Sequence, residues 1–231
     1  MDRLTRKELK TDRFAVEVRH TVSFLTEHRQ QVIRYGAVAA VVVVVALGIY
    51  LFNRHQKNAR HQALEAALRI YQAPIGSPEP GGYPTPAERD KAVVKSFTEL
   101  LGRYSSGQEA AVAHYYLGAI AVSQGRYADA EKDLRQAADS GHAAYASLAQ
   151  LALAEVYAGQ GKLADAERLL RGLMDKPTLF VSKEQAAIEL ARLLGPAKPA
   201  EARKLLEPLR TEKRSAVSRA ALTQLAALPA K

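Results

Sequence analysis

The longest apolar stretch of the chain is the run YGAVAAVVVVVALGIYLF at residues 35–52, which contains no charged side chain. Arg34 comes directly before it, and Arg54 stands two residues after it. As a helix rising 1.5 Å per residue, the run would cover about 27 Å, close to the roughly 30 Å hydrocarbon core of a bilayer. A strand of this length would be unusual.

A cleavable secretion signal is the other interpretation of this run. Such a signal has an apolar region of about 7 to 15 residues that leads into a site of small residues. The run at 35–52 is longer and ends in IYLFNRHQKNAR, with no small-residue site. The pattern therefore predicts an uncleaved single transmembrane helix at 35–52.

The residues before this run show the spacing of an amphipathic helix. Apolar side chains recur every three or four positions, which places them on one helix face: Phe14, Val18, Val22, Leu25 and Val32. We expect residues 1–34 to form a tail with an amphipathic helix next to the membrane. Such a helix either lies on the lipid headgroups or docks a membrane partner, and we favour the first.

After the anchor, one helical pattern recurs at a fixed interval. Three segments align without gaps: RYADAEKDLRQ from Arg126, KLADAERLLRG from Lys162 and KPAEARKLLEP from Lys198, 36 residues apart. Self-similarity at this period is typical of a solenoid, in which each helix pair buries its apolar face against its neighbours. Residues 53–231 are therefore predicted to form an all-α domain of stacked helix pairs.

The units at 114–138 and 150–174 resemble the tetratricopeptide repeat. The matching positions are Leu117 and Gly118, Leu153 and Ala154, Gly125 and Gly161, Ala130 and Leu134, and Ala166 and Leu170. We expect Gly118 and Ala154 to allow close helix approach, and Gly125 and Gly161 to end the first helix of each pair. Ala130 and Ala166 should lie where the two helices of a pair cross. The units depart from the family pattern at His114, Gln150 and His142, and their spacing exceeds the family's usual one by two residues.

Weaker units flank these two. SKEQAAIELARLLG and KPAEARKLLEPL form a third pair, followed by a capping helix at about 213–227. HQALEAALRIYQ and PAERDKAVVKSFTELLGRY form a first pair, separated by an insert at 73–86. This insert holds five of the ten prolines, so we expect a loop. It is either a tolerated surface insertion, which we favour, or a binding element.

Composition and charge point away from catalysis and from nucleic acid. The formal charge of +9 is spread over interleaved acidic and basic residues, so we expect solvated helix faces and no nucleic-acid partner. The chain has no cysteine, and His55 and His61 lack a metal-ligand spacing. The acidic residues of DAEKD and DAER are interpreted as solvated i,i+4 partners. No catalytic motif is present, so we predict a protein that is not an enzyme, with no cofactor, metal or small-molecule substrate.

The resemblance implies a concave groove lined by the first helix of each pair. Carried over to this sequence, the groove positions of the family are Val112, Tyr115, Ala119, Val122, Ser123, Leu148, Leu151, Glu155 and Ala158. This surface is apolar with little charge, which suits an extended polypeptide. The competing interpretation is that these residues are buried against a neighbouring helix.

The order of parts, a basic tail, one anchor and a repeat domain, resembles the ancillary subunit family of the bacterial SecYEG translocon (YfgM-like). The resemblance implies a protein of the bacterial inner membrane, with partners among the translocon, periplasmic chaperones and secreted chains. The tail carries eight Lys or Arg, and long domains cross membranes largely regardless of charge, so we expect the tail in the cytoplasm and the domain in the periplasm. The basic residues close to the anchor are about equally numerous before and after it, so they do not decide the orientation. Two alternatives stay open: an adaptor that assembles an envelope or division complex through one fixed partner, and a cytoplasmic adaptor of reversed topology.

Overall fold

The computed structural model describes residues 29–76 and 81–229. In these residues every regular element is a helix, and the one departure is an isolated β-bridge between Ile75 and Tyr83. The predicted all-α fold is therefore confirmed. The predicted tail helix lies outside the described residues, apart from 29–34.

Helix α2 (Arg29–Tyr71) contains the whole apolar run and continues past it for 19 residues, which include most of the first predicted repeat helix. The chain divides into two compact units, residues 1–58 and 59–231, so α2 contributes to both. We had expected a boundary at residue 53, but the helix has no break there. A helix can continue because residues 53–60 contain no proline or glycine.

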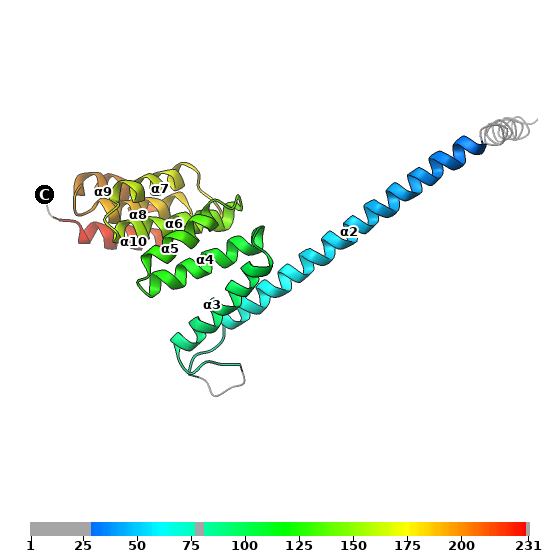
Figure 1. Cartoon of the computed structure of the whole chain (residues 1–231). Coiled ribbons are helices and arrows are strands. Elements are labelled where there is room, and N and C mark those ends of the chain that lie inside the picture. The colour runs from blue at the N-terminus through cyan, green and yellow to red at the C-terminus, as the bar shows by residue number, and fades with distance from the viewer. Residues whose placement is uncertain (1–28, 77–80, 230–231) are drawn as a thin grey trace, which may run out of the picture. The chain divides into compact units, whose positions relative to one another are not determined.

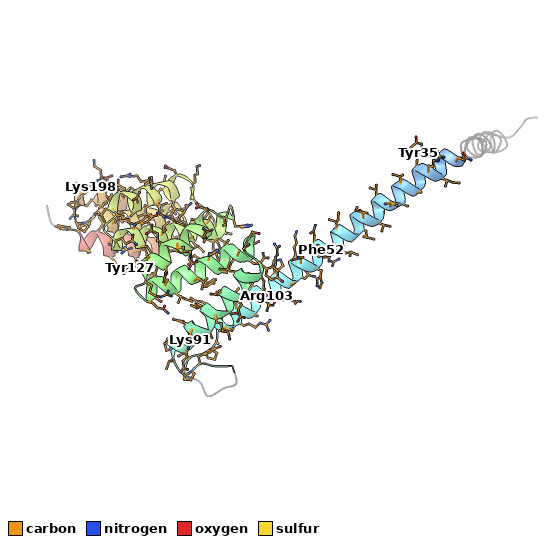
Figure 2. The ribbon with its side chains drawn as sticks, in the orientation of Figure 1. Tyr35, Phe52, Lys91, Arg103, Tyr127 and Lys198 are labelled. Atoms are coloured by element: carbon orange, nitrogen blue, oxygen red, sulfur yellow. The ribbon has the colours of Figure 1, made fainter. Side chains whose placement is uncertain are left out.

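In the first unit, α2 is long and apolar enough to cross a membrane, and none of its most apolar window is buried. Figure 2 shows the side chains between Tyr35 and Phe52 projecting from the helix on all sides. Valines on every face of an isolated helix would be unfavourable in water, whereas lipid solvates them. The segment therefore has the character of a helix that needs an apolar environment.

The second unit is a stack of helix pairs, shown in Figure 1. Each helix packs on the next in sequence, α4 also contacts α6, and α10 packs on α8. Following the end of α2, the elements are α3 (Pro86–Arg103), α4 (Gln108–Ser123), α5 (Tyr127–Ala138), α6 (Ala143–Gly159), α7 (Leu163–Asp175), α8 (Lys183–Leu194), α9 (Pro199–Leu206), the 3₁₀ turn η1 (Glu207–Thr211) and α10 (Ser215–Ala227). The predicted pairs and the predicted capping helix are all present.

The predicted insert lies between α2 and α3. Thr85 caps α3, because its hydroxyl accepts the N–H of Glu88 at 3.2 Å. Pro86 then occupies the first helical turn, where its missing N–H has no consequence. The predicted loop at 73–86 is therefore one residue too long at its end.

The two helices of a pair differ in character. The first helices, α4 and α6, are mostly apolar and have no separate charged face, whereas the second helices, α5 and α7, have one apolar and one charged face. A helix that is apolar all round is covered on several sides or carries a binding surface. The first helices are covered on several sides, because each packs against two or more neighbours, and each keeps one partly exposed face.

The glycines of the repeat act as predicted. A Cβ at Gly118 would lie 2.6 Å from Cγ of the buried Leu134, so glycine permits the close approach of α4 and α5. Gly125 and Gly161 have φ of 71° and 75° and end α4 and α6. After each of them a Schellman pattern closes the helix: the N–H of Arg126 donates to the Ala121 carbonyl at 2.9 Å, and that of Lys162 to the Tyr157 carbonyl at 2.8 Å. Ala130 and Ala166 are fully buried.

The charged faces of the second helices are joined to one another. Within α5 and α7, Arg135 pairs with Glu131 and Arg171 with Glu167, the i,i+4 partners that we predicted. The same glutamates also reach the next repeat: Lys162 lies 3.0 Å from Glu131, and Lys198 lies 3.3 Å from Glu167. The predicted interpretation was therefore incomplete, because these carboxylates also connect successive units.

Candidate peptide-binding groove

The structure places the nine predicted groove residues on α4 and α6, in three states of exposure. Val112 is buried, with 2% of its surface exposed, so it belongs to the core as the competing interpretation proposed. Ser123 is exposed, and 49% of the Glu155 side chain is exposed, so this carboxylate is about half-buried. The others are partly buried: Tyr115, Ala119, Val122, Leu148, Leu151 and Ala158.

Aromatic side chains connect the first helices across the repeats. We define the aromatic strip as Tyr71, Tyr115, Tyr116, Tyr145 and Phe180. Its ring centroids are 4.8 Å apart between Tyr71 and Tyr116, 5.4 Å between Tyr116 and Tyr115, 5.7 Å between Tyr115 and Tyr145, and 6.1 Å between Tyr145 and Phe180. These separations are typical of interacting aromatic pairs. The strip therefore runs without interruption from α2 to the loop before α8.

Two tyrosines of this strip, Tyr115 and Tyr116, stay neutral at physiological pH. Burial, followed by the neighbouring Tyr71 and Tyr145, raises the pKa of the Tyr115 hydroxyl above its ordinary value. Burial and the same neighbours raise the pKa of Tyr116. Each ring thus combines an apolar surface with a neutral hydroxyl, which can donate to or accept from the backbone of a bound chain.

The loop between α7 and α8 holds apolar side chains in an exposed position. Leu179 is 96% exposed and Phe180 is 47% exposed. The loop is ordered, because the N–H of Thr178 donates to the Val181 carbonyl at 2.9 Å, and the hydroxyls of Thr178 and Ser147 lie 2.8 Å apart. Val181 is fully buried beneath it. The fold therefore presents Leu179 beside the end of the aromatic strip.

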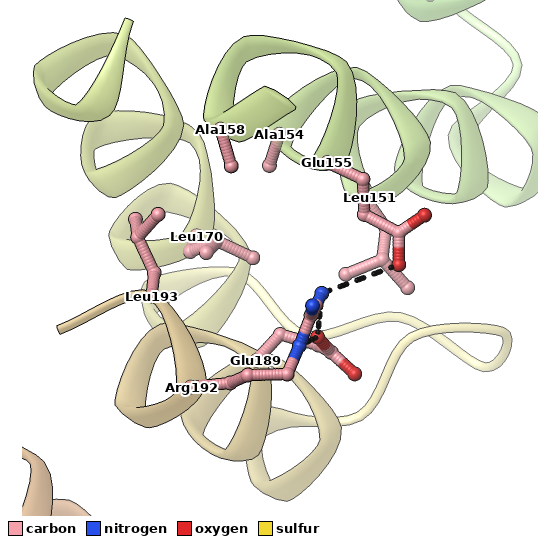
Figure 3. Close-up of a pocket in the computed structure, with 8 residues that line it drawn as sticks. All are labelled: Leu151, Ala154, Glu155, Ala158, Leu170, Glu189, Arg192 and Leu193. Atoms are coloured by element: carbon pink, nitrogen blue, oxygen red, sulfur yellow. Dashed lines mark hydrogen bonds and ion pairs between the residues drawn. The ribbon is translucent and has the colours of Figure 1, made fainter. Parts of the chain in front are cut away.

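A pocket of about 180 Å³ opens between α6, α7 and α8 (Figure 3). Three of the predicted groove residues line it: Leu151, Glu155 and Ala158. The other lining residues were not predicted: Ala154 from α6, Leu170 from α7, and Glu189, Arg192 and Leu193 from α8. The first helices of two successive repeats thus meet at this pocket.

The pocket is apolar with an ionic group at one side. Arg192 lies 2.7 Å from Glu189 and 3.5 Å from Glu155, as the dashed lines of Figure 3 show. Burial first, and then the negative charge of Glu189, raises the pKa of Glu155, and the positive charge of Arg192 opposes this. Two carboxylates therefore share one guanidinium, which leaves the ionic group about one negative charge.

A sequence signal for Arg192 did exist. Leu190 and Ala191 are buried as Leu153 and Ala154 are, so LAR at 190–192 corresponds to LAE at 153–155, an interval of 37 residues. Our alignment of the second helices used 36. One residue fewer separates Leu190 from Lys198 than separates Leu153 from Lys162, because α8 ends sooner after the shared Leu-Ala pair, and this hid the correspondence. For the aromatic strip, the available signal was an aromatic residue in the middle of α4, near the start of α6 and just before α8: Tyr115, Tyr145 and Phe180.

The described residues contain no group of three or more His, Cys, Asp or Glu that could hold a metal ion. What this surface offers is a partly exposed apolar strip, neutral hydroxyls and one acidic pocket on a solenoid. Fold and surface together define a protein–protein interaction module.

Comparison with known proteins agrees with this class. The family model described as "Tetratricopeptide repeat-like domain" matches residues 32–187, more than half of the chain, so the chain belongs to this family. The match begins within α2 and ends within α8. Domains of this kind are generally non-catalytic interaction modules. Searches of curated proteins and of solved structures found no match.

Proposed function

We propose that the chain is a membrane-anchored scaffold that binds extended segments of other proteins along the aromatic strip. The supporting observation is the strip itself, because it runs across successive first helices and stays partly exposed. Tyrosine supplies a large contact area, little loss of side-chain entropy and a polar end, and it is enriched at binding hot spots. An extended chain would lay alternate side chains on the strip.

The anchor and its orientation are part of the proposal. With residues 35–52 in the bilayer and the basic tail in the cytoplasm, the repeat domain works on the periplasmic side of the inner membrane. Tethering raises the effective concentration of the groove near that surface, so a weak interaction is sufficient. The partners are then the lipid bilayer and proteins of the envelope.

For the partners we propose chains leaving the Sec translocon and the periplasmic chaperones that receive them. The order of tail, anchor and repeat domain supports this, together with a groove whose apolar surface accepts many sequences. The rival function is an adaptor that holds one fixed partner of an envelope or division complex. The pocket, with its defined charges, is the feature that favours this rival.

In-cell photocrosslinking tests the proposal. A photoreactive amino acid replaces Tyr115 or Leu151 in the groove, and Arg168 on the charged face of α7 serves as the control position. We expect crosslinks from the groove positions to translocon subunits, chaperones or many secreted chains, and few from the control. One stoichiometric partner would favour the adaptor instead. Crosslinks to cytoplasmic proteins alone would contradict the orientation, which a topology reporter fused after Lys231 checks independently.

A further inference from the structure

The pocket between α6, α7 and α8 has two chemically different sides. Its interior is apolar, with Ala154 and Leu170 almost fully buried and Ala158 and Leu193 partly exposed. At its side lie the charged residues Glu155, Glu189 and Arg192, as Figure 3 shows. An occupant that matches the pocket must therefore be apolar at one end and charged or polar next to it.

The volume of the pocket limits the apolar part to one side chain. An apolar cavity of about 150 Å³ is large enough to bind benzene. The pocket here measures about 180 Å³ and opens on the groove. It therefore accommodates the ring of a phenylalanine or the branched end of a leucine, and little more.

The ionic group determines the sign of the neighbouring charge. Arg192 is close to Glu189 at 2.7 Å but lies 3.5 Å from Glu155, so Glu155 is the less completely paired carboxylate. The negative charge of Glu155 also helps to raise the pKa of the Tyr115 hydroxyl on α4, after burial and the neighbouring tyrosines. A cation placed at Glu155 would balance the remaining negative charge, whereas an anion would be repelled by both carboxylates.

We propose that this pocket selects segments in which a phenylalanine or leucine stands next to a lysine or arginine. The apolar side chain enters the cavity, and the cationic side chain pairs with Glu155. This inference rests on the proposed peptide-binding function and specifies the segments that the groove prefers. Two neighbouring residues of an extended segment can make both contacts at once. The stem of a lysine or arginine is long enough to cover apolar surface while its charged end turns back to the Glu155 carboxylate.

Binding of short fluorescent peptides to the full chain in lipid nanodiscs tests the selection. The probes are peptides of about nine residues, made of serine and alanine with a central Phe-Lys, Phe-Glu or Ala-Lys pair. By fluorescence anisotropy we expect Phe-Lys to bind about fivefold more tightly than Phe-Glu, the order expected of a partly exposed charge pair. Ala-Lys should bind more weakly than Phe-Lys, because the cavity stays unfilled.

Two variants separate the cavity from the charge, and one serves as the control. Glu155→Gln should reduce the difference between Phe-Lys and Phe-Glu to less than about twofold. Ala158→Phe should fill the cavity and remove the preference for Phe-Lys over Ala-Lys, and circular dichroism checks that it folds. Glu207→Gln removes one exposed carboxylate from η1 and should behave as the parent chain does.

The outcomes distinguish this inference from the function on which it rests. If Phe-Lys and Phe-Glu bind the parent chain equally well, the charge selection is wrong and peptide binding by the groove still stands. If Phe-Lys and Ala-Lys bind equally well, the cavity does not take the apolar side chain. If none of the three peptides binds at millimolar concentration, both the inference and the proposed groove function are overturned.

Discussion

Replacing Gly118 by alanine should destabilise the repeat domain, because no room exists for one more methyl group between α4 and α5. The new Cβ would lie 2.6 Å from Cγ and 2.8 Å from Cδ2 of Leu134, and 3.3 Å from its backbone nitrogen. Carbon atoms normally stay 3.5 to 4.0 Å apart. Leu134 is fully buried, so its side chain cannot turn towards solvent to relieve the contact.

The size of the effect follows from two opposing contributions. Alanine is favoured over glycine in a helix interior by about 1 kcal/mol. Forcing an additional carbon into a packed core costs about 1 to 3 kcal/mol.

Gly172 offers a matched control in α7, because a Cβ there would meet nothing within 4 Å. Gly172→Ala should therefore show the helix contribution alone, and the difference between the two variants reports the packing cost.

Urea unfolding followed by circular dichroism measures this difference. We expect Gly118→Ala to be about 1 to 3 kcal/mol less stable than Gly172→Ala. Combining Gly118→Ala with Leu134→Ala removes the clashing atoms, so the substitution should then be tolerated, and the double-mutant cycle should show a coupling energy of more than 0.5 kcal/mol. Equal stability of Gly118→Ala and Gly172→Ala would refute the close packing of α4 and α5.

Three further predictions concern charge. The affinity for the Phe-Lys peptide should fall as the pH drops through the pKa of Glu155, which lies above the ordinary 4.5, since only the ionised carboxylate attracts the cation. In Glu155→Gln this pH dependence should be absent. Glu167→Gln should lower the free energy of unfolding at pH 7 by about 0.5 to 1 kcal/mol. The hydrogen bond from Arg171 lowers the pKa of Glu167 in the folded chain. The stabilisation by the ionised Glu167 is therefore lost as the pH falls through this lowered pKa. In acid, the free energies of unfolding of Glu167→Gln and of the parent chain should become equal. Val43→Arg adds about 2.5 to 3.5 kcal/mol to the insertion free energy, so carbonate should extract it from membranes; retention equal to the parent would contradict the anchor.

The fold was predictable because it repeats. The two central units share one series of signals: a small residue at the helix contact, a glycine of positive φ after the first helix, and an apolar face on the second helix. The structure carries all of them. The continuation of α2 through residue 53 was not predictable in this way. The predicted boundary rested on a change of composition, from apolar residues that face lipid to mixed residues that face the core. Such a change needs no break in the backbone of the helix, and α2 continues through it.

The groove was predictable only in part, because its residues depend on how successive repeats meet. The places of Tyr115, Leu151 and Glu155 in the groove could be predicted, because they depend only on the repeat pattern within a single unit. Arg192 and Leu193 reach the pocket from the next unit, whose first helix ends sooner after the shared Leu-Ala pair, and Phe180 reaches the strip from a loop. Val112 was expected in the groove, but the packing around the start of α4 buries it.

The distribution of charge between the two kinds of helix explains how the groove can stay apolar. In a solenoid, stability comes from each repeat and from its contacts with its neighbours. Here the glutamates of the second helices supply polar contacts between repeats, with Glu131 paired to Lys162 and Glu167 to Lys198. Arg192 also pairs with Glu155 between the first helices α6 and α8. The rest of their partly exposed face carries mainly aromatic and aliphatic side chains. Such a face adds little to the fold while it is exposed, and the proposed function would explain its composition, because a bound partner would cover it.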